Sequence, residues 1–289
     1  MTADDFGFSH GVNRAILRAH QEGIVTHASL MVTGEAVDEA VAVARANPGL
    51  SVGLHLVVVS GRSALSPSEI PDLVDGNGRF PWGPVRSGLR YQFGGRSVRT
   101  QLRREIRAQL ERFLQTGLPL AHVDGHLHMH LHPVVLSDLV ELADEFGIRA
   151  IRLPLEELRA NLAFDSRAAA RKLVWSWIFG RLRRHGERRL RSAGIAFADR
   201  VYGLLQTGCV TEEYLLDLLP RIRVSVAEIY CHPDSLLPGE PRNGPPGAGR
   251  AELDAVTSPR VRRAVEACGF MLAGVREMAS RGLARSVRS

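Results

Sequence analysis

Short apolar segments alternate with amphipathic segments along most of the chain. Six apolar segments predict strands, at residues 26–32, 50–58, 120–124, 150–153, 227–231 and 270–272. Apolar residues at helical spacing predict helices between them, at residues 11–22, 35–46, 98–116, 133–146, 211–222 and 259–267. Ser9 is the expected N-cap of the first helix. Strands that alternate with helices favour a parallel sheet with crossover helices, in a (β/α) barrel or a doubly wound sheet.

Two segments are longer than ordinary connections. Residues 60–97 are rich in Gly, Pro and Ser, and a loop of this length predicts a lid or a substrate wall. Residues 161–194 predict a long basic helix with an apolar stripe that includes Leu173, Trp177 and Leu182. Over residues 168–184 this pattern is typical of a helix that contacts a membrane surface, and equally of one that packs on the barrel or on a partner subunit. No linker divides the chain, so we expect residues 1–289 to form one domain.

Composition narrows the class of protein. The chain has 289 residues and 45% hydrophobic content, which is enough for a large core. Its three cysteines, Cys209, Cys231 and Cys268, are widely spaced and favour a reducing cytoplasm over a disulfide framework. Neither a signal peptide nor an apolar run of about 18 residues is evident, so we expect a soluble or peripheral protein. Despite a net charge of +6, the sequence has no nucleic-acid motif, and we expect no nucleic-acid partner.

Imidazoles alternate with other residues from His122 to His132. In an extended chain this spacing places a row of side chains on one face. The row consists of Asp124, His126, His128 and His130. Neutral imidazole is a common metal ligand and acid–base group, so the row predicts a metal or catalytic site. A nonspecific metal-binding tract is the alternative.

Further polar residues lie at the C-terminal ends of predicted strands or just beyond them. They are Asp4, Asp5, His55, Arg152 and His232. In a (β/α) barrel these strand ends meet on one rim, where active sites are built. Residues far apart in the sequence are therefore expected to converge there.

Four motifs resemble those of the YdjC-type carbohydrate deacetylases, a family that includes chitooligosaccharide deacetylases. They are Asp4 to Ser9, Gly53 to Leu56, His122 to His130 and Glu228 to Pro233, in the family's order. The resemblance spans nearly the whole chain and implies a TIM-like (β/α) barrel. It also implies that Asp5, His55 and His126 hold a divalent metal and that Asp4 is the catalytic base.

The chemistry of these residue types agrees with metal-dependent removal of an N-acetyl group from an amino sugar. One carboxylate and two imidazoles leave metal positions open for water and substrate; Zn²⁺ suits them, whereas Mg²⁺ prefers more oxygen ligands. His232 is the expected acid that protonates the leaving amine, with His128 or His130 as substitutes. Arg152 is a candidate clamp for substrate or carboxylate. We expect Asp124, His128 and His130 to line the substrate site beside it.

Two departures from the family pattern stand out. Gly125 occupies a position that is usually Ser, and we expect this to alter only a local hydrogen bond. Family members also have an apolar strand before the Asp pair, whereas this chain begins with Met1-Thr2-Ala3. We therefore expect the first strand to be largely missing and Asp4 and Asp5 to be poorly held.

Residues 53–80 resemble the subgroup associated with hopanoid biosynthesis. This resemblance implies an N-acetylglucosaminyl hopanoid as substrate. Such a glycolipid would suit peripheral contact of residues 168–184 with the inner membrane. The family resemblance also suggests a homodimer.

Three other hypotheses about the function remain open. Gly7-Phe-Ser-His-Gly11 matches a nucleophile elbow, with Ser9 as nucleophile, but the apolar strand that this motif needs is absent. Clustered His and Asp also suit a metal-dependent phosphoesterase on a similar barrel. A nonenzymatic metal-binding protein at a membrane surface is the third alternative.

Overall fold

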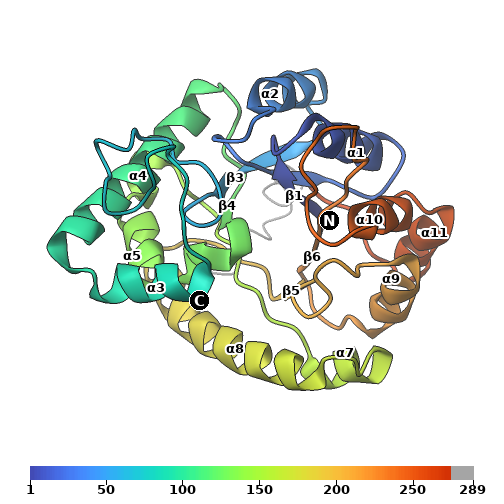
Figure 1. The fold of residues 1–289 in the computed structure, drawn as a ribbon. Coiled ribbons are helices and arrows are strands. Elements are labelled where there is room, and N and C mark those ends of the chain that lie inside the picture. The colour runs from blue at the N-terminus through green and yellow to red at the C-terminus, as the bar shows by residue number, and fades with distance from the viewer. Residues whose placement is uncertain (275–289) are drawn as a thin grey trace.

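The computed structural model describes residues 1–274, and a curled sheet of six parallel strands lies at its centre (Figure 1). The strands are β1 (Thr2–Phe6), β2 (His27–Leu30), β3 (Ser51–Leu56), β4 (Val123–Gly125), β5 (Arg200–Tyr202) and β6 (Ala227–Cys231). Their order across the sheet is β4-β3-β2-β1-β6-β5. The predicted α/β class with parallel strands is thereby confirmed, and the sheet forms a half-barrel.

The first strand is present, so the prediction that it is largely missing is wrong. All five residues of β1 are buried, and β1 pairs with β2 on one side and β6 on the other. The sequence of β1 has no apolar pattern, because its polar side chains bind partners in the interior. Thr2, for example, donates its hydroxyl hydrogen to Glu228 at 2.8 Å. Asp4 and Asp5 are consequently held at the middle of the sheet.

Between β4 and β5, the two edge strands of the sheet, the structure has isolated β-bridges in place of further strands. Residue pairs Val123–Ile151, Ala150–Ala196 and Leu155–Val201 form isolated β-bridges. The predicted strand at 150–153 is therefore reduced to bridges, and residues 270–272 form no strand. The short strand β5, which the sequence did not predict, follows on the far side of this gap.

Helices surround the sheet (Figure 1). Those at predicted positions are α1 (His10–Gln21), α2 (Val37–Ala46), α4 (Gly95–Gln115), α5 (Pro133–Glu141), α6 (Ala143–Phe146), α8 (Ala169–Ser192), α9 (Glu212–Leu218) and α11 (Pro259–Ala267). The unpredicted ones are α3 (Pro84–Phe93), α10 (Ala248–Val256) and the 3₁₀ turn η1 (His126–Leu131). The helix α7 (Leu158–Phe164) overlaps the start of the helix predicted at 161–194, and the 3₁₀ turn η2 (Leu219–Arg221) ends the helix predicted at 211–222. Ser9 caps α1 as predicted, because its hydroxyl accepts from the Val12 N–H. Among residues 1–274, no helix is both long and apolar enough to cross a bilayer.

The helix α4 fixes the end of β3 and the long segment that follows it. Leu102, Ile106 and Leu110 lie one turn apart on α4 and are buried in the core. Gln109 on the same helix makes two hydrogen bonds to the backbone of Val57, which lies just beyond β3. Glu105 accepts from two backbone N–H groups at the start of residues 64–83. Part of the predicted loop at 60–97 is therefore tied to α4, and its last third is helical.

Candidate metal centre

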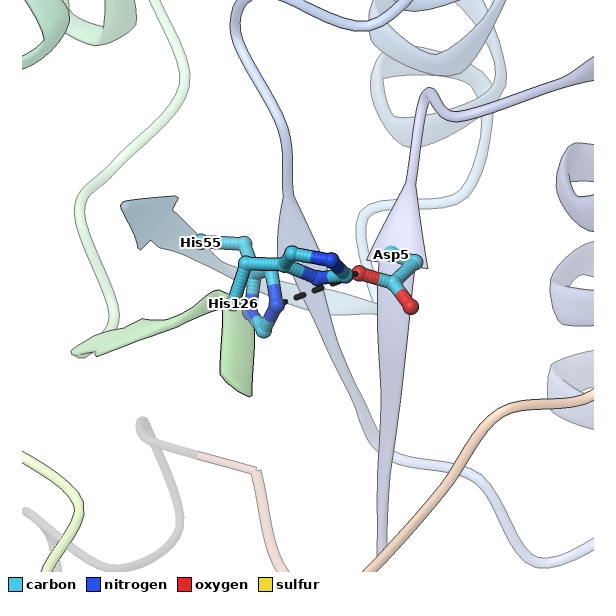
Figure 2. Close-up of side chains that lie close together, drawn as sticks. All are labelled: Asp5, His55 and His126. Carbon is cyan, nitrogen blue, oxygen red and sulfur yellow. Dashed lines mark hydrogen bonds and ion pairs between the residues drawn. The ribbon is translucent and has the colours of Figure 1, made fainter. Parts of the chain in front are cut away.

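Asp5 reaches the site through a local irregularity in β1. Its φ is +62°, and the pairing of β1 with β2 shifts register between Ala3 and Phe6. A non-glycine residue in this left-handed region is strained, and such strain is found mainly at functional sites. The irregularity turns the Asp5 carboxylate toward the C-terminal ends of β3 and β4 (Figure 2).

His55 lies near the end of β3 and is 2% exposed. Its Nδ1 is 2.8 Å from Oδ1 of Asp124 on β4. Its Nε2 is 3.2 Å from Oδ1 of Asp5, yet it is buried with no hydrogen-bond partner. An imidazole held at one nitrogen by a carboxylate, with the other nitrogen free, is typical of a metal ligand.

His126 follows β4 directly, and there the predicted extended row of histidines is wrong. The strand ends at Gly125, and the chain enters η1 with positive φ at Leu127 and His128. Gly125 packs closely on β3, because a Cβ at its position would lie 2.9 Å from the Leu56 carbonyl oxygen. The turn brings Nδ1 of His126 to 3.0 Å from Oδ1 of Asp5.

Asp5, His55 and His126 converge from three elements and point toward one another (Figure 2). One ligand atom from each lies within 4.8 Å of the others. A carboxylate with two imidazoles suits Zn²⁺ and leaves room for water and substrate. The partnerless Nε2 of His55 is an independent sign that the residues present fit a divalent cation. The structure therefore brings together the three residues predicted as ligands.

Charges around this cluster shift its ionisation. Burial alone would lower the pKa of His55, but the carboxylates of Asp124 and Asp5 outweigh it and raise that pKa to about 10. Burial alone would raise the pKa of Asp5, but His126 and His55 hold it well below its usual range. The negative charge of Asp5 is thus balanced by the imidazoles of His126 and His55, in the place where a cation would sit.

Arg152 organises a second, largely buried group of charges. Its guanidinium donates to both oxygens of Asp4, at 2.6 and 2.8 Å, and lies 2.8 Å from both Asp124 and Glu228. It also lies over the ring of Tyr230, 4.8 Å from the ring centre. The Arg152 side chain is 0% exposed and pairs with carboxylates inside the wall of the site.

Asp124 and His130 are likewise inside the wall. Both residues are 0% exposed. Asp124 binds His55 and Arg152, and Nε2 of His130 donates to the Arg152 carbonyl at 2.9 Å. Both residues therefore contact other residues of the site. His128 is only partly buried, and its Nε2 lies 2.9 Å from the hydroxyl of Tyr230.

His232, the predicted acid, lies between two carboxylates just after β6. Its Nε2 is 4.0 Å from Asp4, and its Nδ1 is 3.9 Å from Glu252. Glu252 also accepts from the backbone N–H of His232. The His232 side chain is 22% exposed, so it can reach a molecule in the site.

Sequence reasoning did not assign several residues that complete the site. Ser29 on β2 hydrogen-bonds Asp124 at 2.7 Å and His122 at 3.0 Å. Asn243 donates to the second oxygen of Asp5 at 3.0 Å. Single polar residues such as these have no spacing that marks them in a sequence. For Glu228 and Tyr230, their place in the last motif was the available signal.

The protein is thus an α/β half-barrel with an Asp-His-His cluster at the C-terminal ends of its strands. The chain belongs to the YdjC-like protein family, whose model matches residues 1–267. It is 35% identical over 235 residues to a carbohydrate deacetylase of Geobacillus stearothermophilus, covering 81% of this chain and 78% of the relative. The family is thus one of deacetylase hydrolases.

Other relatives match over shorter stretches. A carbohydrate deacetylase of Brevibacillus brevis is 44% identical over 154 residues, which span 53% of this chain and 58% of the relative. A chitooligosaccharide deacetylase of Escherichia fergusonii is 31% identical over 57% of this chain and 67% of its own length. The chain therefore matches little more than half the length of some of its curated relatives.

The fold has a counterpart among solved structures. A crystal structure described as a putative cellobiose-phosphate cleavage protein of Enterococcus faecalis superimposes with a TM-score of 0.72. The match covers 96% of this chain and 97% of the other, at 23% sequence identity. At this identity the likeness concerns the fold alone.

Proposed function

We propose that this chain hydrolyses the N-acetyl group of an amino sugar, with a divalent metal held by Asp5, His55 and His126. The observation that carries the proposal is the buried, partnerless Nε2 of His55, which faces Asp5 beside His126. The relatives named carbohydrate deacetylase support the substrate class. The proposal takes residues 1–289 as a single deacetylase domain.

A bound divalent metal would supply Lewis-acid chemistry, which polarises an acetyl carbonyl and acidifies water. Asp4 is the proposed base that accepts a proton from the attacking water. Arg152 fixes the orientation of the Asp4 carboxylate with two hydrogen bonds and compensates its charge in a buried site.

His232 is the proposed acid. The C–N bond of the amide breaks as the amine leaves, and a proton must reach that nitrogen because an amide anion is a poor leaving group. The exposed part of His232 and its place beside Asp4 suit this transfer. His128 is held by Tyr230 and is the partly exposed substitute.

The experiment is an assay of acetate and amine release from a panel of N-acetylated sugars, with metal-loaded and chelator-treated protein. Loss of one acetyl group per substrate, dependent on metal and abolished in Asp5→Asn, is the expected result. The matched control is Asp144→Asn, because the Asp144 side chain is 99% exposed. Phosphate release from sugar phosphates without acetate release would instead favour a phosphoesterase and sink the proposal.

The same proposal extends to the metal, the substrate, the oligomeric state and the location of the chain, as the sequence predicts them. Two imidazoles favour Zn²⁺ over Mg²⁺ as the metal. The substrate is an N-acetylglucosaminyl hopanoid, and the chain is a cytoplasmic homodimer that contacts the inner membrane through residues 168–184. The exposed apolar residues of α8 support the membrane contact. Deacetylation of a hopanoid glycolipid but not of free chitooligosaccharides would test the substrate.

A further inference from the structure

Exposed apolar side chains concentrate on two helices. Within residues 1–274, eight of the twelve large hydrophobic residues that are exposed lie on α3 or α8. They are Val85, Leu89 and Phe93 on α3, and Leu173, Val174, Trp175, Trp177 and Ile178 on α8. Patches of this kind are rare on soluble surfaces and mark interaction sites.

The helix α3 has its apolar stripe on the outside. Ser87 and Tyr91 form its buried side, and the Tyr91 hydroxyl donates to the Val58 carbonyl. Val85, Leu89 and Phe93 are spaced four residues apart and so form a stripe, and Val85 and Phe93 are each 77% exposed. A solvent-facing helix normally shows the opposite arrangement. Among residues 1–274, the stripe is therefore left uncovered.

The first half of α8 also exposes apolar side chains to solvent. Trp177 is 64% exposed, and the guanidinium of Arg181 stacks over its ring at 5.3 Å. Arg171 lies in a similar way over Trp175, at 5.8 Å. Arginine beside exposed tryptophan is a pairing suited to an interface between water and apolar material.

Both helices pack against the same two elements, α5 and η1. Figure 1 shows α8 along the lower edge of the molecule and α3 at the lower left, above the C-terminal end of α8. The turn η1 itself exposes Leu127, which is 48% accessible. Because η1 also carries His126, the apolar surface adjoins the candidate metal centre.

This side of the molecule is strongly basic. Residues 84–104 contain six arginines and no Asp or Glu, although Arg90, Arg103 and Arg104 pair with carboxylates of other segments. The helix α8 contains seven arginines and one lysine against one glutamate, and of these Lys172 and Arg183 are buried. Arg96, Arg99 and Arg189 line a hollow of about 620 Å³ between α4, α5 and α8. Such charge complements an anionic surface.

We propose that α3 and the first half of α8 together form a docking surface for an anionic lipid bilayer. Apolar residues would enter the interface, and the arginines would meet lipid headgroups. A second copy of the chain is disfavoured here because two arginine-rich faces repel each other. This inference extends the proposed membrane contact of α8 to α3. It rests on the proposed function only in that the substrate would reach the site from the bilayer.

Vesicle flotation of the full chain tests this surface without reference to activity. The vesicles contain phosphatidylcholine with or without 30 mol% phosphatidylglycerol (about one anionic lipid in three). We expect binding to the anionic vesicles, weakened by salt. The double variant Leu89→Ser/Phe93→Ser should lower the bound fraction at least about fivefold. Trp177→Ser should have a similar effect, whereas the control Leu114→Ser, on α4, should bind like the unmodified chain.

Three outcomes would overturn the proposal. The first is binding unaffected by the α3 double variant when its thermal melting matches that of the control. The second is equal binding to vesicles with and without anionic lipid. The third is a dimer of the unmodified chain, seen by light scattering, that the α3 variant converts to monomer, because the face would then be a self-association surface. A catalytically inactive chain that still binds vesicles would refute the proposed function and leave this inference intact.

Discussion

The Nδ1 atom of His55 lies 2.8 Å from Oδ1 of Asp124. Because a carboxylate only accepts, the hydrogen of this bond belongs to His55. The bond leaves Nε2 directed at Asp5, where it has no hydrogen-bond partner. Ser29 and Arg152 in turn hold Asp124. The orientation of one candidate ligand thus depends on residues outside the cluster of Asp5, His55 and His126.

Replacement of Asp124 should weaken metal binding. In Asp124→Asn the amide can present a donor to His55, so the ring loses its fixed orientation and part of its basicity. We expect zinc affinity to fall about 10–100-fold. Competition with a chromophoric chelator measures this change. Affinity equal to that of the exposed control Asp144→Asn would show that Asp124 does not orient a ligand.

Removal of Arg152 should destabilise the fold. Arg152→Gln leaves the carboxylates of Asp4, Asp124 and Glu228 buried side by side without their cation. Uncompensated buried charge costs about 3–5 kcal/mol of unfolding free energy. Urea unfolding measures the loss. The matched control Arg149→Gln removes an arginine whose side chain is 76% exposed and should change stability little.

Loss of His232 should affect the rate of hydrolysis more than binding. His232→Gln removes the proposed acid while leaving Asp5, His55 and His126 in place. We expect kcat to fall about 10²–10⁴-fold, with KM and metal content nearly unchanged. Steady-state kinetics with metal analysis checks this. A rate close to that of the unmodified chain would transfer the role of acid to another residue, such as His128.

Glu156 should make stability depend on pH. It is buried, and burial raises its pKa to about 7, although the N–H of Leu205 donates to it. A raised pKa means that the folded state favours the protonated form. Its contribution to stability is therefore present below about pH 4.5 and is lost as pH rises through 7.

The variant Glu156→Gln removes this dependence. Between pH 5 and pH 8 the unfolding free energy of the variant should gain on that of the unmodified chain, by on the order of 3 kcal/mol. Chemical unfolding at several pH values measures the difference. A difference that stays constant over this range would contradict the assignment.

The sequence predicted those parts of the fold that have a continuous apolar pattern. It missed β1, because Thr2, Asp4 and Asp5 are polar residues whose partners come from distant parts of the chain. It also predicted an extended row after Asp124, since alternation of side chains says nothing about positive φ at Leu127 and His128. Local patterns do not contain these tertiary contacts.

The candidate ligands could be chosen from the ordered motifs, and the structure brings the three of them together. Their supporting residues could not be chosen in the same way. Ser29 and Glu252 belong to none of the motifs, so only the fold shows that they face Asp124 and His232. Burial likewise separates Arg152, which is inside the wall, from His232, which is partly exposed.

Anomalous X-ray diffraction at the zinc edge, from crystals of the zinc-loaded chain, tests directly whether Asp5, His55 and His126 hold a metal. We expect one strong peak about 2.0–2.2 Å from a carboxylate oxygen of Asp5 and from one imidazole nitrogen each of His55 and His126. A zinc peak elsewhere, with none between these three side chains, would contradict it.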